Sequence, residues 1–293
     1  MKFVSRFITA AFVTVLFSAT PANAGTIVLG HIDHSSSEAT AIVIQTMLER
    51  MGFNVAVKKG LPSVMYPILA EGGIDLFVAA RLPNDHAPYW EEYKDELVLV
   101  TPLYEDARLF WAVPDYVPAS AVRSIADLAN SDVVSRMNKV IRGPEADSPL
   151  MIRSESVMKA YGLSQAGYQL APGKTADWVA RFNASVKAEK WFVMPLWQPH
   201  YLNMTAKLRI LDEPKILLGE PDTAWLIAHK DAKRKIGEMA FGVLEKMELS
   251  LKAVNEIDYR MNVAKLSAHD AARSWMGAHF HIIEYWLDPE YED

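Results

Sequence analysis

The chain has 293 residues, no cysteine and a formal net charge of −6. Hydrophobic residues make up 51% of it and charged residues 23%, which is the balance of a globular protein of one large domain or two medium ones. The negative charge disfavours nucleic acid or an anionic membrane as a partner, and without cysteine the fold must be held by burial rather than by disulfides.

The first 24 residues are typical of a secretory signal peptide. Lys2 and Arg6 form a basic start, residues 7–19 are apolar, and small residues precede a cleavage site after Ala24. An uncleaved membrane anchor is the alternative, but the apolar stretch is short for a span and wrongly flanked. Cleavage takes the charge from −6 to −8, and we expect a soluble protein released into the periplasm.

The first part of the chain alternates strands with helices. Short apolar runs predict strands at residues 25–30, 53–57, 74–80, 96–100 and 107–113, and helical periodicity predicts helices at residues 38–51, 62–71 and 88–94. This order with short connections implies a parallel sheet covered by helices. Pro114 is where we expect the chain to leave one lobe for another.

A second unit of strand, polar turn and helix begins at residue 139. Its turn contains Gly143 and Ser148, and two such turns that face each other would form a cleft. Further strands are predicted at residues 168–170, 191–197, 207–211 and 223–229, the last of which rejoins the first lobe. Helices are predicted at residues 124–129, 149–161, 175–190, 233–247, 250–262 and 267–287.

Trp197 and His200 follow a buried strand that is interrupted by prolines. Pro195 and Pro199 fix φ and lack a donor, so this strand should open into a loop, where α/β sheets usually place binding groups. A stiff indole face at that point suits a cation that has no hydrogen to donate. The alternative is that Trp197 is a core aromatic and His200 a solvated loop residue.

The turn after the first strand is a candidate anion site. His34, Ser35, Ser36 and Ser37 lie at the start of the first helix, where free backbone N–H groups can hold a carboxylate. Serines are also natural helix N-caps, and capping alone is the alternative.

Arg81 directly follows the third strand, near the carboxyl edge of the predicted sheet. There an arginine can clamp a carboxylate or phosphonate with two parallel hydrogen bonds. It can instead form a structural ion pair with Asp85 or Glu105, and the sequence leaves both possibilities open.

Motifs that would indicate an enzyme are missing from the chain. There is no Gly-x-Ser-x-Gly turn, phosphate-binding loop, His-Glu-x-x-His sequence or cysteine nucleophile. His31 and His34 alone are a weak metal signal. We therefore expect a binding protein with no catalytic residue, metal or cofactor, and a periplasmic hydrolase is a remote alternative.

Five segments together carry a resemblance to a known family. They are residues 33–40, Gly73-Ile-Asp-Leu-Phe-Val-Ala-Ala-Arg-Leu-Pro83, Trp111-Ala-Val-Pro-Asp-Tyr-Val117, Leu196-Trp-Gln-Pro-His200 and Leu211-Asp-Glu-Pro-Lys215. In their order and spacing the chain resembles the glycine betaine-type (OpuAC-like) substrate-binding proteins of ABC importers, over nearly all of the mature chain.

The resemblance implies a two-lobe, type II-like periplasmic-binding-protein fold of the α/β class. Each lobe would be a mostly parallel sheet flanked by helices, and a two-segment hinge would join them. Residues 25–111 and 212–293 would form the first lobe, and residues 112–211 the second. The lobes would close over a quaternary-ammonium zwitterion, and the loaded monomer would dock on an ABC permease in the inner membrane.

The resemblance also implies roles for particular residues. Trp197 would be a wall of an aromatic box and His200 its polar neighbour, while the serine turn and the turn from Gly143 to Ser148 would contact the carboxylate. The chain departs from the family at Arg81, where many members have a tryptophan; by this resemblance Trp178 would compensate for its absence. An arginine favours a ligand with its anionic end toward it: a longer betaine, a proline-like or histidine-like amino acid, or an aminophosphonate.

Overall fold

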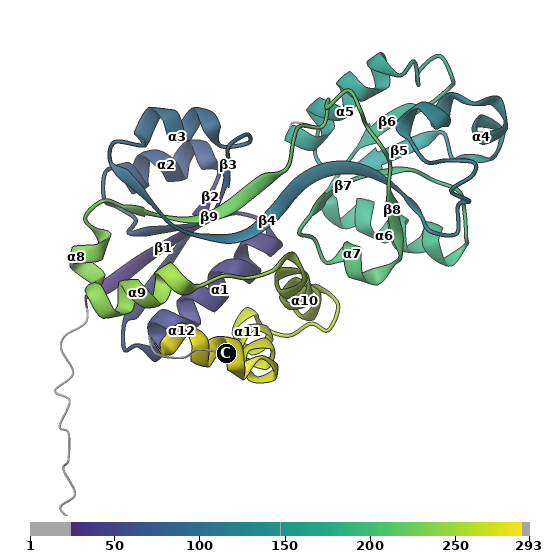
Figure 1. Ribbon diagram of the computed structural model, residues 1–293. Helices are drawn as coiled ribbons and strands as arrows, with labels where there is room; N and C mark the ends of the chain where they lie inside the picture. Colours follow the sequence, from purple (N-terminus) through teal and green to yellow (C-terminus); the bar gives the residue numbers. More distant parts are fainter. Residues whose placement is uncertain (1–24, 147, 289–293) are drawn as a thin grey trace, which may run out of the picture.

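The computed structural model describes residues 25–146 and 148–288, so the predicted signal peptide, residues 1–24, lies outside the described residues. Two α/β lobes lie side by side and are joined by extended segments, which confirms the predicted two-lobe fold class (Figure 1). We call these the first lobe and the second lobe.

The first lobe contains the N-terminal and C-terminal parts of the chain. Its strands are β1 (Thr26–Ile32), β2 (Asn54–Gly60), β3 (Leu76–Leu82), the first half of β4 (Leu97–Pro114) and β9 (Asp222–His229). Its helices are α1 (Ser35–Arg50), α2 (Pro62–Ala70), α3 (Ala87–Tyr93), α8 (Ala232–Ile236), α9 (Glu238–Lys246), α10 (Leu251–Asn262), α11 (Ala268–Ala278) and α12 (Phe280–Leu287).

The second lobe contains the middle of the chain. Its strands are the second half of β4, β5 (Val140–Gly143), β6 (Gln169–Pro172), β7 (Met194–Gln198) and β8 (Leu208–Ile210). Its helices are the 3-10 helix η1 (Ile125–Ala129), α4 (Ser131–Arg136), α5 (Pro149–Ala160), α6 (Thr175–Lys187) and α7 (Leu202–Thr205). The lobe boundaries given above at residues 111 and 211 stay a prediction.

The main sheet has the strand order β2-β1-β3-β9-β4-β7, with β8 beside β4. The first three strands are parallel, as the sequence predicts, because helices return the chain to the same edge. The strands that the chain adds later run antiparallel: β9 to β3 and β4, and β7 and β8 to β4. A separate two-stranded sheet pairs β5 with β6 in parallel. The main sheet is therefore mixed, whereas the two-stranded sheet is parallel.

Strand β4 corrects the prediction of two strands at residues 96–100 and 107–113. It is one strand of 18 residues that pairs with β9 in the first lobe and with β7 in the second (Figure 1). The polar residues between the two predicted strands look like a loop, but they stay extended with register shifts, and Asp106 has a φ of 62°. The strand therefore carries the chain continuously from lobe to lobe.

Three helix predictions also need correction. The predicted helix at residues 233–247 is divided into α8 and α9 at Gly237, whose φ is 88°, and that at residues 267–287 is divided into α11 and α12 at His279. Residues 125–129 form a 3-10 helix rather than an α-helix. Among the described residues, no helix is long and apolar enough to span a bilayer.

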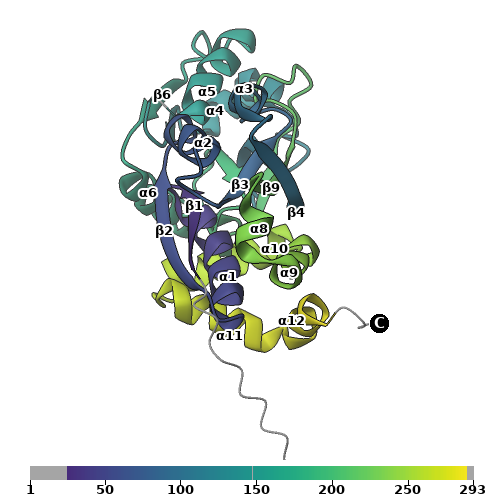
Figure 2. The ribbon, with the colours of Figure 1, turned by 90° about the vertical axis from the view of Figure 1, so that its left-hand side faces the viewer.

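The sheet of the first lobe is covered on both faces. Helices α1 and α9 to α12 pack against one face in a large apolar core, and α2 and α3 pack against the other (Figures 1 and 2). The sheet face toward α1 is called the α1 face below, and the opposite face the α2 face. Both faces matter for the site, because the alternation of side chains along β3 is interrupted. Side chains after the interruption point to the opposite face from the one that regular alternation would give.

Candidate functional site

A bulge in β3 decides where Arg81 points. Leu76 and Val78 pack into the core on the α1 face and Phe77 into that on the α2 face, as strand alternation requires. Ala79 also joins the α1 face, with a φ of 63°, and the pairing with β9 shifts register there. The extra residue exchanges the two faces, so Arg81 emerges on the α1 face.

We expect the bulge to resist a branched side chain. Ala79→Val should lower the free energy of unfolding by about 2 kcal/mol or more, because a β-branched residue is strained at positive φ and this site is fully buried. Ala79→Gly should stay within about 1 kcal/mol of the wild type, because glycine adopts this φ without strain. Urea denaturation measures both changes. Equal stability of the two variants would contradict this account of the bulge.

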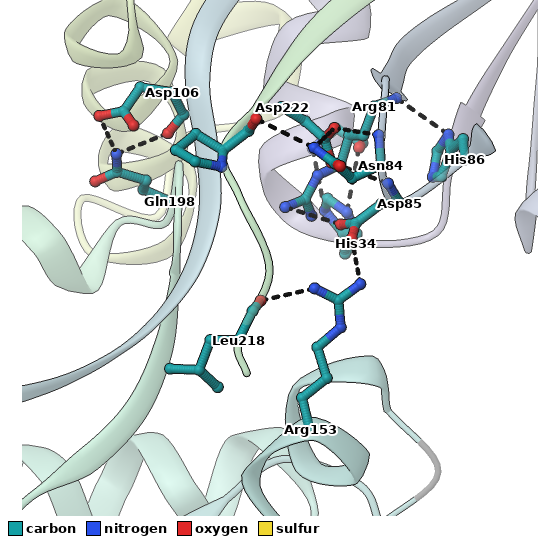
Figure 3. Close-up of polar contacts among 12 residues, drawn as sticks. His34, Arg81, Asn84, Asp85, His86, Asp106, Arg153, Gln198, Leu218 and Asp222 are labelled. Atoms are coloured by element: carbon teal, nitrogen blue, oxygen red, sulfur yellow. Dashed lines mark hydrogen bonds and ion pairs between the residues drawn. The ribbon is translucent and has the colours of Figure 1, made fainter. Parts of the chain in front are cut away.

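Arg81 lies near the N-terminal turn of α1 and is paired with an acidic neighbour (Figure 3). Its Nη2 atom is 3.1 Å from Oδ2 of Asp85, and the two side chains are 14% and 16% exposed. This is one of the ion pairs that the sequence left open. The pair does not use the whole guanidinium, since Nε is buried and has no hydrogen-bond partner among the described residues. A buried donor without an acceptor is costly, so Arg81 retains a donor for a further anionic oxygen. Arg81 is also part of β3 rather than following it.

The loop that carries Asp85 is fixed by the buried Asp222 at the start of β9. The Asp222 carboxylate accepts hydrogen bonds from the backbone N–H groups of Asn84 (2.6 Å) and Asp85 (3.0 Å), and from the Asn84 amide at 3.0 Å (Figure 3). Asp85 is therefore held in place on the first lobe before it contacts any arginine.

Three histidines in this region share one hydrogen-bond pattern. In His34, His86 and His200, Nδ1 accepts a hydrogen bond from a backbone N–H, so the proton of the neutral ring is on Nε2. The three donors, at 3.3, 3.1 and 3.1 Å, are the N–H groups of Ser37, Arg81 and Leu202.

The histidines are held neutral. Burial lowers the pKa of His34 to about 4 and the pKa values of His86 and His200 to about 3. The Arg81 charge lowers the pKa of His34 and His86 further, and His34 in the first lobe acts on His200 in the second. Neutral N–H donors can bind an anionic oxygen without repelling a nearby ammonium group.

We expect acid to destabilise the protein through these histidines. Because their folded pKa values lie below the ordinary value of 6.5, the stability they contribute is complete above pH 6.5 and is lost as the pH falls, at about 1.4 kcal/mol per histidine and pH unit. Asp258 opposes this, because burial raises its pKa to about 6 and it favours the folded state as the pH falls through 6. The net loss should be about 3 kcal/mol per pH unit between pH 6 and 5.

Urea denaturation at pH 7, 6 and 5 measures this slope. His86→Asn keeps an oxygen that can accept the Arg81 N–H and removes one titrating group, so it should reduce the slope by about 1.4 kcal/mol per pH unit. An unchanged slope would contradict the assignment of a lowered pKa to His86.

The second lobe contributes an aromatic cluster. The rings of Trp178 on α6 and Trp197 on β7 are stacked, with centroids 5.5 Å apart and planes 12° apart. His200 packs edge-on against both rings, at 4.4 Å from Trp197 and 5.8 Å from Trp178. His200 is also close to Trp178, so it does not lie on the side of Trp197 that points away from Trp178. That side of Trp197 is therefore covered by neither Trp178 nor His200. No ammonium group fits between rings in direct stacking contact, so a cation–π contact with Trp197 requires the opposite face.

Trp178 is nearly buried, at 3% exposure, and its indole Nε1 has no hydrogen-bond partner among the described residues. In the part of the chain that the structure describes, four buried donors have no acceptor: Arg81 Nε in the first lobe, Trp178 Nε1 and Arg209 Nε in the second, and Arg108 Nε on β4. A polar ligand would relieve the cost of leaving Arg81 Nε and Trp178 Nε1 unpaired.

Two contacts hold the lobes against each other. On α10 of the first lobe, Asn255 and Asp258 accept the backbone N–H groups of His200 and Tyr201 of the second lobe, both at 2.8 Å. On α5 of the second lobe, Arg153 reaches Oδ1 of Asp85 at 3.1 Å (Figure 3). The two lobes are therefore in direct contact in this structure.

The serine turn is engaged mainly in local contacts. His34 caps α1, and its Nδ1 atom is 3.1 Å from the Ser36 hydroxyl, while Nε2 is 3.4 Å from the Ser37 hydroxyl. Ser35 donates to the buried Asp258 carboxylate. The N-cap is thus His34 rather than a serine, and any role of these serines toward a ligand stays a prediction.

The turn of the second lobe is likewise occupied by local contacts. The Ser148 hydroxyl caps α5 at the Met151 N–H and donates to the Glu145 carbonyl oxygen. A Cβ on Gly143 would lie 2.1 Å from the Met151 sulfur, so any larger residue there would have to displace the Met151 side chain. Among the described residues neither Gly143 nor Ser148 contacts the other candidate side chains, and their ligand role stays a prediction.

The sequence missed several residues of this site. Asp222, Arg153 and Asp258 each reach the site through a contact between distant parts of the chain, which no local pattern reveals. His86 is local, since it accepts the Arg81 N–H from five residues further along the chain. The spacing of Arg81 and Asp85 by four residues was a further local signal. Among the described residues, no group of three histidine or acidic side chains could hold a metal ion.

Comparisons with known proteins place this chain in a family. Residues 25–278 match the family described as the substrate binding domain of the ABC-type glycine betaine transport system, and the chain belongs to this family. The glycine betaine/carnitine transport binding protein GbuC of Listeria monocytogenes is 24% identical over 160 residues, which are 55% of this chain and 53% of that protein. The match thus spans about half of this relative.

Solved structures cover more of the chain. The lactococcal OpuAC structure, closed and complexed with glycine betaine, has a TM-score of 0.74 and 25% identity, and covers 90% of this chain and 100% of its own. The glycine betaine/L-proline-binding protein ProX from Borrelia burgdorferi has a TM-score of 0.73 and 23% identity over 91% of this chain and 98% of its own. A choline-binding protein in complex with choline has a TM-score of 0.71 and 21% identity over 90% and 92% of the two chains. These matches confirm the two-lobe fold.

Proposed function

We propose that this chain is a periplasmic solute-binding protein that delivers a betaine-like zwitterion, a quaternary ammonium compound with a carboxylate, to an ABC permease. Family membership supports the transport role, and the signal-like start of the chain supports the periplasm. The protein acts as a monomer that binds and releases its ligand without catalysis and without a cofactor.

One observation carries the choice of ligand. The second lobe offers a face of Trp197 that neither Trp178 nor His200 covers, and the first lobe offers a buried Arg81 Nε without an acceptor. The indole face takes the methylated ammonium and the arginine takes the carboxylate. The neutral His34, His86 and His200 supply further donors without adding positive charge that would repel the ammonium.

A second ligand class is a zwitterionic amino acid or an aminophosphonate, such as proline, histidine or aminoethylphosphonate. Arg81 favours it, since a guanidinium binds a carboxylate or phosphonate equally well. The two classes differ at the cationic end: a primary ammonium needs hydrogen-bond acceptors, whereas a trimethylammonium needs only the indole face.

Calorimetric titration of the full chain with glycine betaine, carnitine, choline, proline, histidine and aminoethylphosphonate separates these classes. We expect micromolar affinity, about −8 kcal/mol, for a carboxylate-bearing betaine and much weaker binding of choline. Tight binding of proline or histidine with none of a betaine would transfer the assignment to the second class, and substrate turnover would overturn the binding role.

A further inference from the structure

The contact between Arg153 and Asp85 joins the two lobes at the residue that also holds Arg81. Arg153 is on α5 of the second lobe, and Asp85 and Arg81 are on the first (Figure 3). The two oxygens of the Asp85 carboxylate are divided, Oδ2 to Arg81 and Oδ1 to Arg153, both at 3.1 Å. Closure of the lobes therefore brings a second positive charge to the pair that Asp85 forms with Arg81.

The second lobe and the segment leading back to β9 hold Arg153 in this pose. Its Nη1 donates to the Leu218 carbonyl oxygen at 2.7 Å (Figure 3). Gly219 leaves room for the guanidinium, since a Cβ there would lie 1.9 Å from Nη1. Nη2 then projects toward Asp85, whose loop Asp222 holds fixed. Both partners are thus oriented, so the contact forms when the lobes approach and is broken when they part.

The charges in this cluster make the contact sensitive to the ligand. With the lobes apart, Arg81 faces the carboxylate of Asp85, and a ligand carboxylate on Arg81 would be repelled by it. With Arg153 in contact, the negative charge of Asp85 is shared between two arginines, so Asp85 neutralises less of the Arg81 charge and repels a ligand anion less. A ligand without an anion gains nothing from this second arginine.

We propose that Arg153 is a specificity-determining residue that makes lobe closure favour ligands with an anionic group at Arg81 over purely cationic ligands. It acts through Asp85 and does not need to touch the ligand. This inference rests on the proposed function, because it assumes that Arg81 holds the anionic end of the ligand.

Glycine betaine and choline are suitable probes, because they share the trimethylammonium group and differ in the carboxylate. We expect Arg153→Met to weaken glycine betaine binding about tenfold or more in calorimetry and to change choline binding less than about threefold. Arg153→Lys, which keeps the charge, should recover part of the discrimination. Lys159→Met on the exposed face of the same helix is the matched control and should leave both affinities unchanged.

If Arg153→Met weakens the binding of glycine betaine and of choline equally, Arg153 only holds the lobes together and the specificity claim is overturned. Unchanged affinities for both compounds would overturn the whole inference. If the wild type binds neither probe, the proposed function fails instead. The contact between Arg153 and Asp85 is then tested alone, by measuring the distance between two spin labels. The labels are attached at Met239→Cys on the first lobe and Lys187→Cys on the second, both exposed sites in a chain with no other cysteine. Arg153→Met should increase the mean of that distance and widen its distribution. An unchanged distribution would show that Arg153 does not hold the lobes together.

Discussion

Replacing Trp197 by alanine should weaken binding of a carboxylate-bearing betaine about thirtyfold or more. The indole face opposite Trp178 is the surface that the account assigns to the ammonium group, and a desolvated cation–π contact contributes about 2 kcal/mol or more. The stack with Trp178 and the edge contact with His200 are lost as well, which loosens the rest of the cluster. Calorimetry with glycine betaine measures the change.

Trp191→Ala is the matched control. Trp191 is also a half-buried tryptophan of the second lobe, but its ring packs under the guanidinium of Arg136, with the Cζ atom 3.6 Å from the centroid. Within the described part of the chain, the ring contacts of Trp197 and His200 do not include Trp191. Its replacement should lower stability with little effect on affinity. If Trp191→Ala weakens binding as much as Trp197→Ala, the loss reflects damage to the second lobe rather than a missing contact with the ligand.

Replacing Arg81 by methionine should cost about 10- to 150-fold in glycine betaine affinity, because a hydrogen bond to a charged group contributes about 1.5–3 kcal/mol. Choline affinity should stay the same or rise, since the lost charge repels a cation. Asp85 keeps Arg153 as a partner, so the substitution does not leave it as an unpaired buried carboxylate. Calorimetry with both compounds gives the two effects separately.

Thermal unfolding of Arg81→Met serves as the control for the fold, and Arg81→Lys should retain part of the affinity because it retains the charge. A methionine variant that loses affinity for choline and glycine betaine alike would mean that Arg81 only supports the structure. In that case Arg81 Nε, although it lacks an acceptor in the structure, would not be the contact for the ligand carboxylate.

Much of the fold follows from local patterns. The strand, polar turn and helix at the start of the chain appear where the sequence places them, and the first three strands are parallel as their helical connections require. The continuity of β4 could not be predicted in this way. Residues 101–106 are polar enough for a loop, and they stay extended because β9 comes from more than a hundred residues later to pair with them.

The site was less accessible to sequence reasoning for the same reason. Arg81, Trp197 and His200 can be picked out from the sequence next to them. In the structure His34 lies near both Arg81 and His200, and His200 contacts Trp197. The direction of Arg81, however, depends on a positive φ at Ala79, which nothing in an alanine-rich strand signals. The contact of Arg153 with Asp85 joins residues 68 positions apart, and charge alone does not identify such a partner among 30 lysines and arginines.

A crystal structure of the full chain grown with glycine betaine tests the central claim most directly. The account predicts the carboxylate within hydrogen-bond distance of Arg81 Nε, and the methylated nitrogen over the face of Trp197 that points away from Trp178. A ligand bound elsewhere, or one whose carboxylate turns to the second lobe and leaves Arg81 Nε without an acceptor, would contradict it.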